Sequence, residues 1–158
     1  MKQQSWKPYL LWVLFTEAVG ALAAVLTRDA AAIYASQLNK PPLSPPAAVF
    51  PIVWAVLYAL MGVAAARIAQ TPPSAARTSA LRLYLLQLAF NFLWSILFFS
   101  FRAYGFSFVW LVILWALIVR MALAFRELDR PAAWLILPYL LWVLFAGYLN
   151  YGVWMLNR

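Results

Sequence analysis

The sequence predicts an all-α membrane protein, a bundle of five transmembrane helices. Apolar residues make up 67% of the 158 residues and charged residues only 10%, whereas a soluble domain is roughly a quarter charged. Five long runs are almost free of charge, and about 17–25 apolar residues suffice to cross the hydrocarbon core of a bilayer. These runs also lack the polar face that a helix in water requires.

The first span is expected at about residues 8–27, an apolar run interrupted only by Glu17. Gly20 and Ala24 form a small-xxx-small pair, which allows another helix to approach closely. We favour packing inside the bundle for this pair, with a dimer seam as the alternative.

Glu17 lies at the centre of this span, where a charged side chain costs about 2.5–3.5 kcal/mol on insertion scales. One interpretation is a carboxyl group hydrogen-bonded to a neighbouring helix. The other is a ligand contact or a proton relay. We favour the first, because no other ionisable residue lies near mid-membrane to continue a relay.

Residues 28–46 are expected to form a lid loop between the first two spans. Five of the ten prolines fall between positions 41 and 51. Proline fixes φ and lacks an N–H, and it pushes the preceding residue out of the helical region. Residues 40–46 should therefore be stiff and extended, while the alanine-rich stretch 30–38 is compatible with a short surface helix. The lid residues that we single out are Tyr34, Lys40, Pro41, Pro45 and Pro46.

The other four spans are expected at about residues 47–68, 80–101, 106–126 and 132–156. A polar turn that contains Pro72 and Pro73 separates the second span from the third. The remaining turns are short, so consecutive helices should pack antiparallel. We expect the whole chain, residues 1–158, to form a single domain.

The basic residues indicate membrane topology rather than nucleic-acid binding. The net charge is +8, but the basic residues are scattered at segment ends. Eight lie on the N-terminal side, which by the positive-inside rule places the N-terminus in the cytoplasm. These are Lys2, Lys7, Arg67, Arg77, Arg82, Arg120, Arg126 and Arg130, against Arg28, Lys40, Arg102 and Arg158 on the other side.

The chain contains no cysteine and no histidine. This excludes disulfides and thiolate catalysis, and it removes the two best ligands for transition metals. We therefore expect no metal site, no required cofactor and no conventional catalytic residue.

Three spans carry aromatic side chains at helical spacing, so that each set shares one face. An aromatic stripe alone is more typical of packing than of a binding site. However, amide side chains also lie within these stripes, and in a membrane they need polar partners inside the bundle or in a cavity. Together they favour an enclosed pocket for a flat, conjugated ligand. The stripes are Phe50, Trp54, Tyr58 and Met61; Gln87, Asn91, Trp94 and Phe98; and Tyr139, Trp142, Ala146, Leu149 and Asn150.

Three blocks of the sequence, in order, resemble the TspO/MBR family, the tryptophan-rich sensory or translocator proteins. The first block runs from Lys40-Pro41 through Ser44-Pro45-Pro46, Val49-Phe50-Pro51, Trp54 and Leu57-Tyr58 to Leu60-Met61-Gly62. The second is Gln87-Leu88-Ala89-Phe90-Asn91 with Trp94. The third is Pro138-Tyr139, Trp142, Phe145-Ala146 and Leu149-Asn150.

The resemblance implies a five-helix bundle, often dimeric, with a ligand cavity beneath the loop that joins the first two helices. It implies binding of porphyrins such as protoporphyrin IX, and of sterols or synthetic ligands in some members. Leu43 stands where members often have a tryptophan, which argues against photochemistry that needs an indole in this loop. The binding positions that the resemblance implies are Trp54, Tyr58, Asn91, Trp94, Tyr139, Trp142, Ala146 and Leu149, to which the stripe on the second span adds Phe50.

The function that we expect is that of an integral membrane receptor for porphyrin-like or other planar hydrophobic ligands, in tetrapyrrole regulation or stress sensing. Its partners would be the lipid bilayer, the small molecule and a second copy of the chain. The expected location is a bacterial inner (cytoplasmic) membrane. The alternatives are a light-dependent porphyrin-degrading enzyme and a transporter of tetrapyrroles or lipids.

Overall fold

The computed structural model describes residues 5–158. Within this range the chain folds into five long helices, each long and apolar enough to cross a membrane. A π-helical turn, Ile96–Ser100, prolongs the third. The prediction of an all-α, five-helix transmembrane bundle is therefore confirmed. The helices are α1 (Lys7–Gln37), α2 (Val49–Ala69), α3 (Ala75–Ser95), α4 (Tyr104–Leu128) and α5 (Arg130–Leu156).

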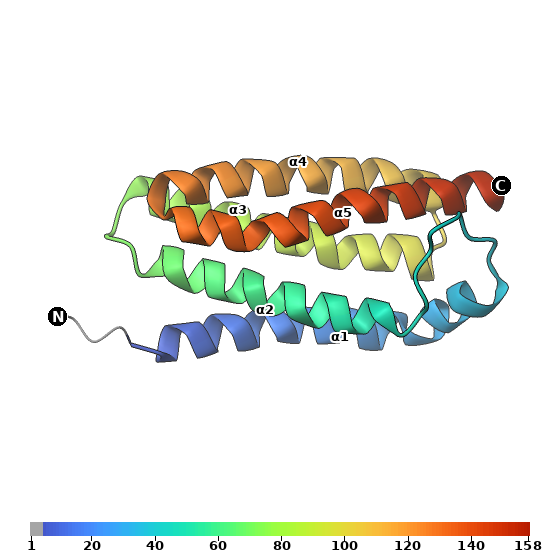
Figure 1. The fold of residues 1–158 in the computed structure, drawn as a ribbon, viewed down its shortest axis with the longest axis horizontal. Helices are drawn as coiled ribbons and strands as arrows, with labels where there is room; N and C mark the ends of the chain where they lie inside the picture. Colours follow the sequence, from blue (N-terminus) through green and yellow to red (C-terminus); the bar gives the residue numbers. More distant parts are fainter. Residues whose placement is uncertain (1–4) are drawn as a thin grey trace.

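The helices form a ring in the order α1, α2, α5, α4, α3, which α1 closes by packing on α3 and on its π-helical turn. Consecutive helices run in opposite directions along the bundle (Figure 1). Gly62 permits a close approach of the backbones of α1 and α2, because a Cβ atom there would lie only 2.6 Å from the Cα atom of Val13.

The first helix is longer than predicted, and most of the expected lid loop is helical. α1 ends at Gln37, not near residue 27, so the connection to α2 consists only of residues 38–48, which we call the lid from here on. The predicted end of the first span was wrong because Arg28 and Asp29 end the apolar run but do not end the helix. The stretch 30–38, for which a short surface helix was expected, is helical as the last part of α1. The alanine-rich stretch that follows has high helix propensity.

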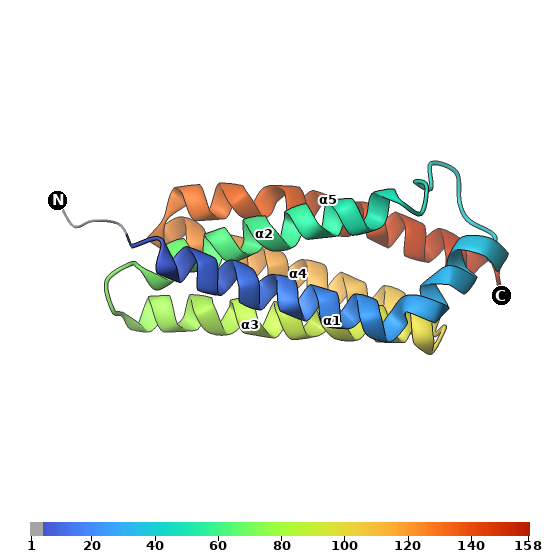
Figure 2. The ribbon, with the colours of Figure 1, turned by 90° about the horizontal axis from the view of Figure 1, so that it is seen from below.

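The last part of α1, drawn in light blue, turns away from the axis of the rest of the helix (Figure 2). Thr27 Oγ1 donates a hydrogen bond to the carbonyl of Ala23 at 2.8 Å, a contact that often bends helices. The turned segment carries the chain over the end of the bundle and into the lid.

The lid is fastened to the C-terminal half of α5. The backbone N–H of Asn39 donates to Asn157 Oδ1 at 3.0 Å, and Asn157 Nδ2 donates to the carbonyl of Asn39 at 2.8 Å. The hydroxyl of Tyr148 donates to the carbonyl of Pro42 at 2.8 Å. The lid is thus held by direct contacts with a helix more than one hundred residues away in sequence.

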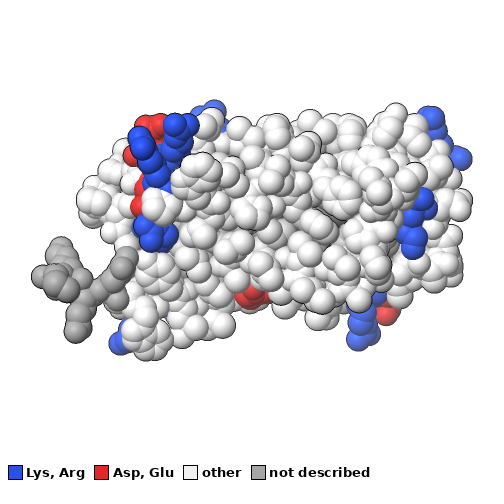
Figure 3. All heavy atoms as spheres, in the orientation of Figure 1, with Lys and Arg blue, Asp and Glu red and all other residues white. Residues whose placement is uncertain are grey.

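Lysine and arginine side chains gather near the two ends of the molecule and leave a broad apolar belt between them (Figure 3). This is the charge distribution of a protein that spans a bilayer. Lys2, which we counted on the N-terminal side, lies outside the described residues.

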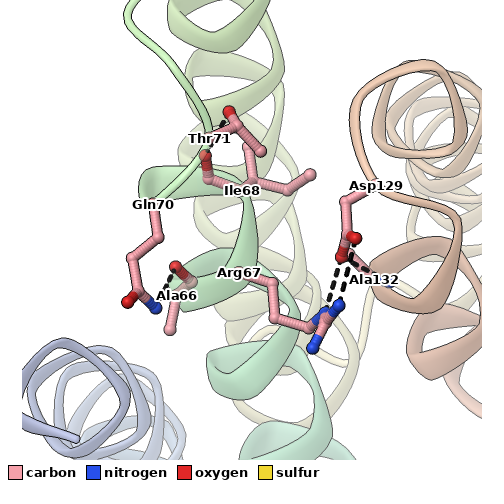
Figure 4. Close-up of polar contacts among 7 residues, drawn as sticks. All are labelled: Ala66, Arg67, Ile68, Gln70, Thr71, Asp129 and Ala132. Carbon is pink, nitrogen blue, oxygen red and sulfur yellow. Dashed lines mark hydrogen bonds and ion pairs between the residues drawn. The ribbon is translucent and has the colours of Figure 1, made fainter. Parts of the chain in front are cut away.

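An ion pair joins α2 to the start of α5 at the end of the bundle that holds the N-terminus (Figure 4). Arg67 Nε donates to Asp129 Oδ2 at 2.6 Å, and its Nη2 donates to Oδ1 at 3.0 Å. The same carboxylate accepts a hydrogen bond from the backbone N–H of Ala132 at 3.1 Å and so caps α5. The hydrogen bond from Arg67 is the main reason that the pKa of Asp129 lies below its usual value.

Candidate functional site

A cavity of about 450 Å³ lies beneath the lid, bounded by α1, α2, α5 and the end of α3. Ligand pockets typically measure roughly 300–1,000 Å³, so the space is adequate for a ligand. Its walls are mainly apolar. The lining residues include Glu17, Gly20, Ala23, Ala24, Thr27 and Tyr34 of α1; Lys40 and Pro45 of the lid; Phe50, Trp54 and Tyr58 of α2; Trp94, Phe98 and Phe99; and Trp142, Ala146, Leu149 and Asn150 of α5.

One wall of the cavity is built from aromatic rings of α2 and α5. Phe50, Trp54 and Tyr58 follow one another at steps of four, which places them on one face of α2. The rings of Trp54 and Tyr58 stack with their centroids 5.4 Å apart. Phe50 meets Trp142 of α5 edge to face at 6.0 Å. These rings present flat apolar surfaces to the cavity.

The lid end of the cavity is bordered by rings from α1 and from the end of α3. Tyr34 meets Phe98 and Phe99 edge to face, each at 5.6 Å. Phe98 in turn stacks on Trp94 at 5.3 Å. Lys40 Nζ lies 5.6 Å from the centre of the Tyr34 ring and donates to the carbonyl of Ala35 at 2.6 Å. A single cation is therefore held at the edge of the lid.

Two of the predicted site residues, Asn91 and Tyr139, lie behind the wall rather than on it. The Tyr58 hydroxyl donates to Asn91 Oδ1 at 2.9 Å, and Asn91 Nδ2 donates to the hydroxyl of Tyr139 at 2.8 Å. Tyr139 then donates to Gln87 Oε1 at 2.8 Å. The amides that the sequence placed inside the bundle thus form a buried chain that holds the ring of Tyr58 in the wall.

A second polar contact fixes Trp94. Its indole Nε1 donates to Asn150 Oδ1 at 3.0 Å, and Asn150 Nδ2 donates to the carbonyl of Tyr104 at 2.8 Å. Asn150 is 1% exposed. Because an unsatisfied amide would be expensive at this depth, these bonds lock the end of α3 against α4 and α5.

The small residues of α1 were not predicted to line the cavity. Small side chains, Gly20, Ala23 and Ala24, form much of its wall. A Cβ atom on Gly20 would lie 2.2 Å from the Tyr58 ring, so Gly20 packs inside the bundle, as we favoured. The pattern of small residues signalled close packing, but it did not reveal that the same face also borders a cavity.

Glu17 also lines the cavity, one turn before Gly20 on α1. Among residues 5–158 its carboxylate has no hydrogen-bond or ion-pair partner in the structure. The expected hydrogen bond to a neighbouring helix is therefore not present.

Among the lid positions discussed from the sequence, Pro41, Leu43 and Pro46 lie outside the lining. Pro41 is buried against Gly152 of α5, where a Cβ atom would lie 2.5 Å from the proline ring. Pro46 is exposed and precedes α2. Leu43 sits at φ 67° and is 83% exposed, so the side chain at this position points away from the protein interior.

The comparisons with known proteins agree with this architecture. A model of the TspO/MBR family matches residues 12–155. The chain belongs to the TspO/MBR family. It is 38% identical to the tryptophan-rich protein TspO of Chlorobaculum tepidum, an alignment that covers 89% of each chain. It is 34% identical to the translocator protein of Bos taurus over 97% of this chain and 92% of that one. It is 37% identical to the tryptophan-rich sensory protein of Cereibacter sphaeroides over 92% of each.

In this TspO/MBR-family chain, Trp142 separates two apolar hollows. Its ring lines the cavity on one side and a groove between α2 and α5 on the other. The groove is open to the outer surface of the bundle and is lined by Ile52, Val53, Val56, Leu57, Leu60, Pro138, Leu141, Trp142 and Phe145.

Proposed function

We propose that this integral membrane protein is a receptor that binds a porphyrin-like tetrapyrrole, or another planar hydrophobic molecule, in the cavity beneath the lid. One observation supports the proposal above all: the cavity combines a volume of about 450 Å³ with flat aromatic walls from α2, α3 and α5. Most of its lining is apolar, and a few polar groups remain to orient a guest, as is typical of small-molecule sites.

Ring stacking alone does not supply the affinity. Each aromatic contact adds roughly 0.5–1.5 kcal/mol beyond the burial of area, whereas micromolar binding requires about 8 kcal/mol. The remainder must come from removal of the ligand's apolar surface from its surroundings when the lid covers it. The fastening of the lid to α5 by Asn157 and Tyr148 therefore belongs to the proposed site.

Charge supports a porphyrin with acidic side chains as the guest. Lys40 lies at the lid edge of the cavity, where it is placed to meet a carboxylate of a ligand whose ring system is buried. The chain also matches family relatives whose names are translocator protein and tryptophan-rich sensory protein.

For the setting, we propose a bacterial cytoplasmic membrane with the N-terminus on the cytoplasmic side. The excess of basic residues at the end of the bundle that holds Lys7, Arg67 and Arg77 supports this orientation. Dimerisation with a second copy is proposed on family resemblance.

Binding is tested by quenching of tryptophan fluorescence with protoporphyrin IX, using protein in phosphatidylcholine nanodiscs. Trp142→Leu and Trp54→Leu should each weaken binding about tenfold or more. Trp134→Leu is the matched control, because Trp134 is 69% exposed and does not line the cavity; it should leave the affinity unchanged. Equal affinities in all four proteins would reject the cavity as the site.

A further inference from the structure

The deep end of the cavity presents an unpaired carboxylate beside aromatic rings. Of the described residues that line the cavity, Glu17 is the only acid and Lys40 the only base. Tyr34, which Lys40 covers, stands seventeen residues after Glu17 on α1, about five helical turns further along the helix. The two charges therefore mark opposite ends of the cavity, and a small ligand at one end does not reach the other.

The position of Glu17 within α1 explains why it adjoins the aromatic wall. Glu17 and Gly20 are three residues apart, so they share a face of the helix. The ring of Tyr58 packs directly on Gly20, and Glu17, Gly20 and Tyr58 all line the cavity. Tyr58 also stacks on Trp54. The carboxylate of Glu17 and the rings of Trp54 and Tyr58 consequently border the same cavity.

Lys40 differs from Glu17 in that it already has partners, the carbonyl of Ala35 and the ring of Tyr34. Glu17 has none among residues 5–158. A carboxylate in apolar surroundings gains most from a charged donor, and the faces of tryptophan and tyrosine attract cations. A protonated amine can pair with the carboxylate and contact the aromatic rings at the same time.

We propose that the deep end of the cavity, formed by Glu17, Gly20, Trp54 and Tyr58, is a subsite for a basic nitrogen carried by a planar aromatic ligand. The inference rests on the ligand cavity proposed above, and it adds to the porphyrin-like guests a second ligand class, aromatic compounds that bear an amine.

The test uses two probes with the same ring system, 1-pyrenemethylamine and 1-pyrenemethanol. Their affinities are measured by energy transfer from tryptophan to pyrene in phosphatidylcholine nanodiscs, with empty nanodiscs as the blank. The parent should bind the amine about tenfold more tightly than the alcohol, or better. Glu17→Gln should abolish this preference and leave the affinity for the alcohol within about twofold, which also shows that the variant is folded.

Two further variants sharpen the result. Glu127→Gln removes an exposed acid at the end of α4, outside the cavity, and should keep the full preference for the amine. Glu17→Asp shortens the side chain by one methylene group and should keep part of the preference for the amine. Equal binding of the two probes by the parent, or a preference that survives in Glu17→Gln, overturns the subsite.

Failure of the cavity itself gives a different result. Trp142→Leu should weaken the binding of the alcohol as well as of the amine, because both pyrene rings contact the wall. If Trp142→Leu changes neither affinity, the cavity is not the binding site, and both proposals fall. If it weakens both while the parent shows no preference, only the amine subsite is rejected.

Discussion

Pro41 of the lid packs directly on Gly152 of α5: a Cβ atom at position 152 would lie 2.5 Å from the Cβ and Cγ atoms of the proline. The lid is therefore seated on a helix that also walls the cavity. Because Pro41 is stiff, a shift at this contact should be transmitted along the lid toward Lys40 and Pro45, which line the cavity.

Gly152→Ala should displace the lid. We expect hydrogen exchange at the backbone amide of Asn39 to accelerate about tenfold, because the displaced lid loses the hydrogen bond from that amide to Asn157 Oδ1. Gly147→Ala is the matched control on the same helix. The nearest atom to a Cβ there is 3.6 Å away, so this change should be tolerated and gain up to about 1 kcal/mol of helix propensity. Unchanged exchange in Gly152→Ala would show that the proline contact does not hold the lid.

The two tyrosines of the buried polar chain should differ in their effect on stability. Tyr139→Phe leaves both Asn91 Nδ2 and Gln87 Oε1 without a partner, whereas Tyr58→Phe leaves only Asn91 Oδ1. Each unsatisfied buried group costs about 1–3 kcal/mol. In detergent, Tyr139→Phe should therefore have a lower unfolding temperature than Tyr58→Phe. Tyr151→Phe is the control, because this side chain is 47% exposed, and it should unfold at the same temperature as the parent. A lower unfolding temperature for Tyr58→Phe than for Tyr139→Phe would contradict the proposed hydrogen-bond chain.

The Arg67–Asp129 ion pair should contribute stability that depends on pH. The pKa of Asp129 is lowered in the folded protein, so the contribution is complete above the unfolded pKa of about 3.9. It is lost as the pH falls through the lower, folded value. Asp129→Asn keeps the N-cap of α5 but loses the charge, and at pH 7 we expect it to be destabilised by about 1 kcal/mol.

Asp129→Ala loses the cap as well and should be destabilised by about 1 kcal/mol more. The unfolding temperatures of the parent and of Asp129→Asn should converge as the pH is lowered below 4. A difference that is the same at pH 7 and at pH 3 would show that the charge is not responsible.

The sequence predicted the residues of the site that have large aromatic or amide side chains. Rings at steps of four on α2 and amides inside the α3 span were sufficient to place Trp54, Tyr58 and Asn91 on inward faces. The aromatic stripe of α5 likewise placed Trp142 beside the cavity. In each case one helix face determines the position of the side chain.

The features of the site that were not predicted depend on which groups face a small side chain or a surface residue in the folded protein. Gly20 and Ala23 indicate only that something approaches α1 closely, and the sequence does not say whether this is a helix or a cavity. The lid was predicted too long, because charge at Arg28 marks the end of the apolar run rather than the end of the helix. Asn39, the lid residue that Asn157 binds, lies more than one hundred residues away in sequence, so no local pattern could reveal that Asn157 fastens the lid.

The most direct test of the account is a titration with protoporphyrin IX of two variants that fill different hollows on the two sides of Trp142. Ala146→Trp places a ring inside the cavity, and Val56→Trp places the same ring in the outer groove. Ala146→Trp should abolish binding, while Val56→Trp should bind like the parent. Loss of binding in Val56→Trp with normal binding in Ala146→Trp would place the ligand on the outer surface and contradict the account.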